Sequence, residues 1–193
     1  TTQFPGIEGD HGVQTVEQAT WQSTNTVYAG MADTVQPARI ADMAGRLGVT
    51  APLKPVYALV LGAEGVSVMD MASVYSTFSR HGVRINPYII RRIEDSDGNV
   101  VFNAATDVER TQAVSPDVAD TVTNVLTGVI SKGTGKAAAF GSPAAGKTGT
   151  TDDAKDAWFA GYTCNLTAAV WIGYENPKTM TQPGGGQMAG GAT

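Results

Sequence analysis

Through the first half of the chain, apolar residues recur at helical spacing and are interrupted by small polar residues that favour turns. This pattern predicts helices starting at 15, at 27–32, from 37 to about 48 and at 66–80. Pro37 supports the third helix, because proline suits the first helical position. The apolar run Val56–Leu61 follows two prolines and is short, which favours a short buried strand.

The clearest helix signal begins at Ser115, an N-cap residue type, with Pro116 at the first helical position. The apolar stripe of this helix consists of Val118, Val122, Val125, Leu126, Val129 and Ile130. Gly133 and Gly135 end it. Upstream, two apolar segments at 88–93 and 100–102 flank the turn-forming residues 95–99, and this arrangement predicts a hairpin.

From Lys147 onward the pattern changes from helix to strand. Segments rich in Thr, Val and aromatic residues predict strands at 147–151, 157–163 and 166–174. Helices followed by an antiparallel set of strands indicate an α+β fold. We expect one partial domain over residues 1–180, with loop at 1–14, and a Gly-rich flexible tail at 181–193.

Composition permits a folded core and excludes several classes of partner. The chain has 193 residues, of which 42% are hydrophobic and 16% charged. Its net charge of −5 gives no electrostatic basis for binding nucleic acid or an anionic membrane. Cys164 is the only cysteine, and His11 and His81 lie far apart, so neither a disulfide nor a metal site is predicted, and no cofactor is expected. The longest apolar stretch, 56–63, is too short to span a bilayer.

Residues 141–148 match the phosphate-loop pattern G-x-x-x-x-G-K-[ST]. That loop needs a buried strand before it and a helix directly after it, whose N-terminus meets the phosphates. Here a helix tail precedes Gly141, and residues 148–151 favour a strand. The letters also resemble the phosphorylated Asp-Lys-Thr-Gly-Thr segment of P-type ATPases, but Gly146 stands in place of the aspartate. Neither class is therefore predicted.

Read as a strand, Lys147-Thr148-Gly149-Thr150 places a cation beside two hydroxyl groups. Side chains alternate along a strand, so Thr148 and Thr150 project to the same face. Gly149 lets a ligand backbone approach closely. This arrangement suits the binding of a carboxylate. Taken alone, the tetrapeptide fits an ordinary Thr-rich edge strand with a solvated lysine equally well.

Longer segments give this tetrapeptide a context. Lys-Thr-Gly is one of three motifs of penicillin-binding proteins and serine β-lactamases, and Ser23-Thr24-Asn25 resembles their Ser-x-Asn motif. From about Val13 to Met180, the chain resembles the bifunctional class A penicillin-binding proteins, most clearly at 23–31, 65–82, 143–151 and 156–178. The resemblance implies a penicillin-binding protein fold, with helices flanking an antiparallel sheet.

The family's Ser-x-x-Lys motif, which carries the nucleophilic serine, does not occur in this sequence. In the family it precedes Ser-x-Asn. The resemblance therefore implies that the nucleophile helix, the first strands of the sheet, a glycosyltransferase domain and a membrane anchor lie upstream of Thr1. We expect the chain to be part of an extracytoplasmic D,D-transpeptidase that works with this upstream segment.

The resemblance also implies a role for each motif residue. Ser23 would pass a proton between the absent lysine and the leaving nitrogen, and Asn25 would bond the amide of the donor peptide. Lys147 would supply positive potential. Thr148 and Thr150 would hold the carboxylate of a D-Ala-D-Ala stem peptide or of a β-lactam, and the Thr150 N–H would be one of two oxyanion-hole donors.

Two other functions fit parts of the pattern: a penicilloyl-sensing receptor domain of the same fold and a non-catalytic binding module. The class A-like run at 65–82 favours the transpeptidase. The acidic residues Asp152, Asp153 and Asp156 suit a solvated turn better than a cation site. Trp158 and Trp171 are predicted to lie in the core or on the face of the sheet rather than to form a sugar platform.

Overall fold

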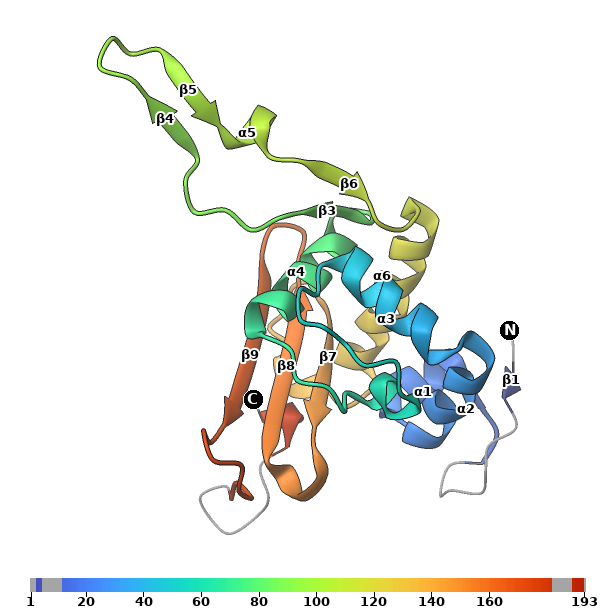
Figure 1. Cartoon of the computed structure of the whole chain (residues 1–193). Coiled ribbons are helices and arrows are strands. Elements are labelled where there is room, and N and C mark those ends of the chain that lie inside the picture. The colour runs from blue at the N-terminus through green and yellow to red at the C-terminus, as the bar shows by residue number, and fades with distance from the viewer. Residues whose placement is uncertain (1–2, 5–11, 182–188, 193) are drawn as a thin grey trace.

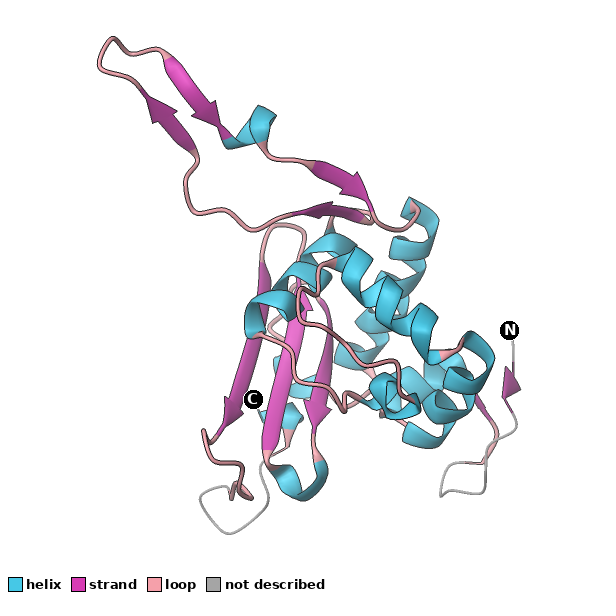
Figure 2. Ribbon diagram, viewed as in Figure 1, coloured by secondary structure: helices cyan, strands magenta, loops and turns pink. Residues whose placement is uncertain are grey.

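The computed structural model of the chain describes residues 3–4, 12–181 and 189–192. A group of helices packs beside an antiparallel sheet to form the body, and a narrow arm projects from it (Figure 1, Figure 2). The α+β expectation is confirmed.

The body begins with α1 (Val16–Gln22), α2 (Asn25–Val35) and α3 (Pro37–Leu47). Thr15 starts α1 with a capping box, since its side chain accepts from the Gln18 N–H while the Gln18 side chain accepts from the Thr15 N–H. Pro37 lies in the first turn of α3, as predicted.

The expectation of loop at 1–14 is wrong at the ends that the structure describes. There β1 (Gln3–Phe4) pairs antiparallel with β2 (Gln14–Thr15). A ladder of two residues per strand is too short to leave an alternating pattern in the sequence. Residues 5–11 of this expected loop lie outside the described residues.

A second correction concerns the apolar run after Pro55. It forms a 3-10 helix, η1 (Tyr57–Leu61), and not a buried strand. Tyr57 and Leu61 are 56% and 47% exposed. Gly62 ends η1 with φ +84, a conformation that suits glycine. A short apolar run does not distinguish strand from helix by periodicity, and here the run packs mainly against α2 and α3.

Two longer helices, α4 (Val68–Ser79) and α6 (Pro116–Ser131), follow the predicted segments closely. Ser67 caps α4 and Ser115 caps α6 through their side chains. Both helices pack on one face of the sheet, where a buried cluster joins them to it. The cluster consists of Tyr75, Leu126, Val129, Ala145, Ala160 and Tyr162.

The sheet contains β7 (Ala145–Thr150), β8 (Asp156–Tyr162) and β9 (Thr167–Gly173), in the order β7-β8-β9 with antiparallel pairing. The predicted strands are confirmed to within two residues. A 3-10 turn, η3 (Asp152–Ala154), joins β7 to β8. In the described part of the chain, β7 and β9 are therefore the edge strands, and β7 is the edge nearer to the N-terminal helices (Figure 1).

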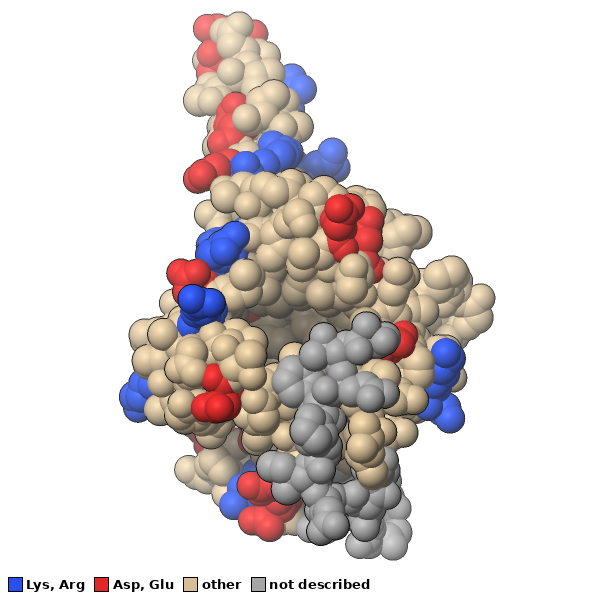
Figure 3. Space-filling view, turned by 90° about the vertical axis from the view of Figure 1, so that its right-hand side faces the viewer, with Lys and Arg blue, Asp and Glu red and all other residues tan. Residues whose placement is uncertain are grey.

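The arm consists of two separate two-stranded ladders. β3 (Val83–Ile85) pairs with β6 (Arg110–Gln112), and further out β4 (Arg92–Glu94) pairs with β5 (Val100–Asn103), which leads into α5 (Ala104–Asp107). The predicted hairpin is confirmed, although β4 is shorter than its apolar segment. Asp95 closes the turn by accepting from the N–H groups of Asp97 and Asn99. Acidic side chains lie at the outer end of the arm, and acidic and basic side chains are interspersed nearer the body (Figure 3).

Short 3-10 segments complete the described chain. η2 (Lys136–Ala138) follows α6 where a helix tail was expected. Near the C-terminus, η4 (Gly190–Ala192) contacts β7 and β8. Residues 182–188, most of the expected flexible tail, lie outside the described residues.

Candidate active site

The site residues selected from the sequence line one cavity of about 620 Å³. The cavity lies between the α1–α2 turn, η1 and the β7 edge. Ser23 and Asn25 reach it from the turn, and Lys147, Thr148, Gly149 and Thr150 reach it from the strand. Segments separated by more than a hundred positions are thus brought together around one hollow.

Ser23 ends α1 in the left-handed region, with φ 58 and ψ 45. Such a conformation is uncommon for residues other than glycine and is typically found where a turn has to present a side chain. The N–H of Ser23 donates to the Ala19 and Thr20 carbonyls, and Asn25 then starts α2. The turn therefore fixes the spacing between the Ser23 hydroxyl and the Asn25 amide.

Packing of α1 on α6 holds this turn in place. Trp21 lies two residues before Ser23. Its side-chain Nε1 donates to the Val125 carbonyl at 3.0 Å, and its backbone carbonyl accepts from the Thr134 N–H at 3.0 Å. Its indole lies against Gly128, where an added Cβ would be 2.0 Å from Trp21 Nε1. Only glycine at position 128 allows α1 to approach this closely.

Lys147 connects the strand to the turn. Its Nζ donates to Ser23 Oγ at 2.8 Å and to the Thr148 carbonyl at 2.8 Å. Burial lowers the pKa of Lys147 to about 8, because the charged ammonium loses hydration. The lysine is still mainly protonated near neutral pH. Since the ammonium has only hydrogens to donate, the Ser23 hydroxyl accepts from it and keeps its own proton available to another group.

Thr148 and Thr150 occupy alternate positions of β7, and each hydroxyl has a partner in the protein. Thr148 is buried, and its Oγ1 lies 2.6 Å from Thr134 Oγ1. Thr150 is exposed, and its Oγ1 accepts from the Gly190 N–H at 2.8 Å. The sequence reasoning missed Thr134 and Gly190, because both lie in irregular segments without a periodic pattern.

Gly149 has a packing role in addition to the ligand approach expected from the sequence. It pairs with Trp158 across the β7–β8 ladder. A Cβ added at Gly149 would lie 3.2 Å from Trp158 Cβ, which is tighter than ordinary contact. The glycine thus lets the indole-bearing strand lie close behind the site.

The acidic turn next to the site makes local contacts. Asp153 pairs with Lys155 at 3.2 Å, and Asp156 accepts from Thr151 Oγ1 and Trp171 Nε1. Within the ranges that the structure describes, no three His, Cys, Asp or Glu side chains group so as to hold a metal ion.

Trp158 and Trp171 form a tilted cross-strand pair with ring centroids 6.4 Å apart. Across those same ranges, no helix has the length and apolar character needed to cross a membrane.

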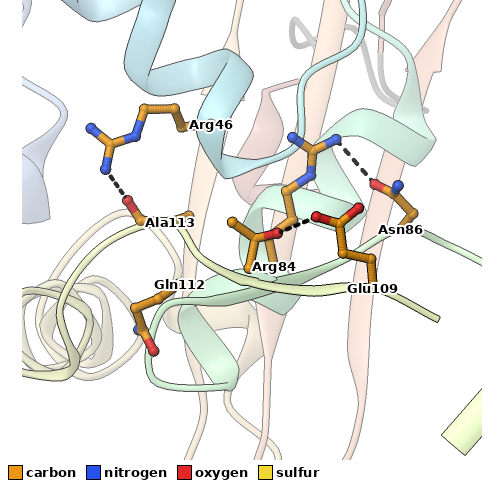
Figure 4. Close-up of a pocket in the computed structure, with 7 residues that line it drawn as sticks. Arg46, Arg84, Asn86, Glu109, Gln112 and Ala113 are labelled. Carbon is orange, nitrogen blue, oxygen red and sulfur yellow. Dashed lines mark hydrogen bonds between the residues drawn. The ribbon is translucent and has the colours of Figure 1, made fainter. Parts of the chain in front are cut away.

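A smaller pocket of about 260 Å³ lies at the base of the arm (Figure 4). Arg46 donates to the Ala113 carbonyl, while Arg84 donates to the Gly45 carbonyl and to Asn86 Oδ1. These bonds tie α3 to the arm. Unlike the cavity beside β7, this pocket has no serine, cysteine or lysine among its lining residues.

Comparison with known proteins identifies the family of the chain. The family model that describes the penicillin binding protein transpeptidase domain matches residues 2–192. Penicillin-binding protein 1A of Mycolicibacterium smegmatis is 32% identical and aligns with 95% of this chain and 26% of its own length. The Aquifex aeolicus protein of the same name is 31% identical, with 90% and 24% covered.

Among solved structures, the penicillin-binding protein PonA1 of Mycobacterium tuberculosis superposes with a TM-score of 0.84 at 28% identity, covering 97% of this chain and 55% of that one. A structure of PonA1 in complex with penicillin V gives a TM-score of 0.83. The chain belongs to the penicillin-binding protein transpeptidase domain family. It spans about a quarter of the length of the curated relatives and about half of the solved PonA1 chain.

Proposed function

We propose that this chain is the substrate-binding part of a class A D,D-transpeptidase that cross-links peptidoglycan stem peptides and is acylated by β-lactams. The observation that carries the proposal is the single cavity in which Lys147 Nζ contacts Ser23 Oγ at 2.8 Å beside the Thr148 and Thr150 hydroxyls. A cation next to paired hydroxyls is suited to a terminal carboxylate. Family membership and the solved complex of PonA1 with penicillin V support it.

In the proposed reaction, a serine outside this chain attacks the penultimate D-Ala carbonyl. The amide bond breaks, the terminal D-Ala leaves with a proton on its nitrogen, and an acyl-enzyme ester forms. An acceptor amine then attacks the ester and releases the serine. Ser23, which accepts from Lys147, is placed to give its own proton to the leaving nitrogen, while the lysine of the absent motif takes the proton of the attacking serine and returns a proton to Ser23. Asn25 lies beside it to bond the donor amide.

The carboxylate of the substrate occupies the other end of the cavity. Thr148 and Thr150 hold it through their hydroxyls, and Lys147 provides the positive potential. The backbone N–H of Thr150 serves as one oxyanion-hole donor, and the second comes from the nucleophilic serine. Loss of one such donor typically costs about 2.7–4 kcal/mol of transition-state stabilisation, so this chain alone retains an incomplete site.

An upstream polypeptide of the same protein completes the proposed enzyme. It carries the Ser-x-x-Lys motif that this sequence lacks, and it anchors the domain on the outer side of the membrane. The β9 edge has no strand partner in the described part of the chain, which leaves room for further strands of the sheet. This partner and the extracytoplasmic placement rest on membership of the family.

Incubation with a fluorescent penicillin followed by denaturing electrophoresis tests the proposal. The purified chain alone should give no labelled band at its mass of 20.0 kDa, because it has no Ser-x-x-Lys nucleophile. When the chain is combined with the upstream polypeptide, the label should appear on that polypeptide only.

The matched control for this experiment is Lys147→Ala in the chain, which should reduce labelling of the upstream partner. A labelled band from the chain alone would refute the proposed division of the site. Labelling of the complex without cross-linking of stem peptides would instead favour a receptor domain that senses penicillin. The absence of labelling in the complex would favour a binding module.

A further inference from the structure

The C-terminal turn is seated directly against the strand that carries the proposed carboxylate site. Gly190, the first residue of η4, is buried, and its N–H donates to Thr150 Oγ1 at 2.8 Å. η4 contacts both β7 and β8. Residues separated by 40 positions therefore meet at one of the two hydroxyls assigned to the substrate carboxylate.

The position of Gly190 has room only for glycine. A Cβ added at Gly190 would lie 2.2 Å from the Gly149 carbonyl oxygen and 2.6 Å from the Trp158 carbonyl oxygen. Both atoms belong to the backbone of the β7–β8 ladder, so they cannot move aside as a flexible side chain would. The absence of a side chain is what brings the Gly190 N–H within hydrogen-bonding distance of Thr150.

The chemical consequence concerns the proton of Thr150. A hydroxyl both donates and accepts, whereas a backbone N–H only donates. Thr150 Oγ1 must accept from Gly190, and this bond does not use the hydroxyl's own proton. A hydroxyl fixed in this way is prepared to donate to an anion. The bond between Thr134 and Thr148 does not settle the same question, because either oxygen can be its donor.

We infer that Gly190 is a positioning residue that sets the Thr150 hydroxyl to donate to the carboxylate of the substrate. The inference rests on the proposed function and extends the site to the C-terminal turn at 189–192. It predicts that the turn contributes to the recognition of a free carboxylate and contributes little to the recognition of the rest of the peptide.

The test compares two ligands on the full chain, acetyl-D-Ala-D-Ala and its C-terminal amide, by NMR titration. The wild-type chain should bind the acid more tightly than the amide. Gly190→Ala should lower the ratio of acid to amide affinity by about fivefold, the range expected for one hydrogen bond. A chain ending at residue 188, which removes the turn without introducing a clash, should show the same loss.

Controls separate this role from general damage to the fold. Gly45→Ala places a methyl group in open space on α3 and should leave the ratio unchanged. Thr150→Ser should retain the preference, and Thr150→Val should lose it. Adding Gly190→Ala to Thr150→Val should then have little further effect, because both changes act through one hydroxyl.

The outcomes distinguish this inference from the proposed function. If the wild-type chain does not prefer the acid, the proposed carboxylate site is wrong. If the wild-type chain prefers the acid and both the Gly190→Ala chain and the shortened chain keep that preference, the positioning role is overturned. Equal weakening of acid and amide binding in both variants also overturns it, because that result indicates a structural role alone.

Discussion

At the scale of single residues, the protonation of Lys147 makes the stability of the chain depend on pH. Its pKa of about 8 lies below the ordinary value of 10.5 because burial penalises the ammonium. As pH rises through about 8, the folded chain loses this proton first, while the unfolded chain keeps it until about 10.5. Between these values the unfolded state binds more protons, so this residue makes the free energy of unfolding rise with pH.

The same titration should weaken ligand binding. We predict that the affinity for acetyl-D-Ala-D-Ala falls about fivefold to tenfold as pH rises through about 8, because the cation facing the carboxylate disappears. NMR titrations between neutral and alkaline pH measure it. Lys147→Gln, which carries no charge, should bind more weakly and show no step in this range. A step that persists in the variant would assign the titration to another group.

Only some of the residues of the site could be identified from the sequence. Ser23, Asn25 and the residues of the β7 strand belong to short motifs, so they were identifiable before any coordinates. Thr134 and Gly190 carry no such signal, because their roles come from contacts with Thr148 and Thr150 across the fold. Whether a hydroxyl donates or accepts a hydrogen bond depends on the partner that it contacts in the folded chain.

At the scale of elements, the helix pair α1 and α6 places the Ser23 turn. We predict that Gly128→Ala lowers the free energy of unfolding by about 3 kcal/mol, because the new methyl group would lie 2.0 Å from Trp21 Nε1 and displace the indole. Denaturant unfolding monitored by tryptophan fluorescence measures this change.

A matched substitution is available on α3. Gly45→Ala introduces the same methyl group in a helix where nothing lies within 4 Å, and it should stabilise the chain by about 0.5–1 kcal/mol through helix propensity. Equal effects of the two substitutions would contradict the tight α1–α6 contact. Loss of acid binding in Gly128→Ala alone would connect that contact to the position of Ser23.

Elements with strong periodicity or clear caps were predictable, whereas the two expectations that proved wrong, the strand at 56–61 and the loop at 1–14, concerned segments that lack both. α6 has Ser115, Pro116 and a long apolar stripe, so its start was evident. η1 presents five apolar residues without a period, and its packing against α2 and α3 decided its conformation. β1 and β2 are held by a pairing that only the folded chain brings about.

At the scale of the whole molecule, the sheet connects the buried core to the cavity. α4 and α6 cover one face of it, and β7 borders the cavity with its edge. The sequence predicted the strands but not their order or which edge would border the site, because pairing depends on contacts distant in sequence. Motif spacing alone could not place the β7 edge beside the α1–α2 turn.

Among the described residues, no strand pairs with the outer edge of β9, and this has a consequence for the isolated chain in solution. Unpaired backbone groups along Thr167–Gly173, together with side chains such as Val170 at 39% exposure, form a template for strands of other molecules. We predict slow, concentration-dependent fibril growth, followed by thioflavin fluorescence, that Val170→Lys delays through charge repulsion. Identical fibril growth of the wild-type chain and the variant would place the aggregating surface elsewhere. If Val170→Lys delays growth, the time for which this chain stays in solution depends on the edge of one strand, despite a net charge of −5.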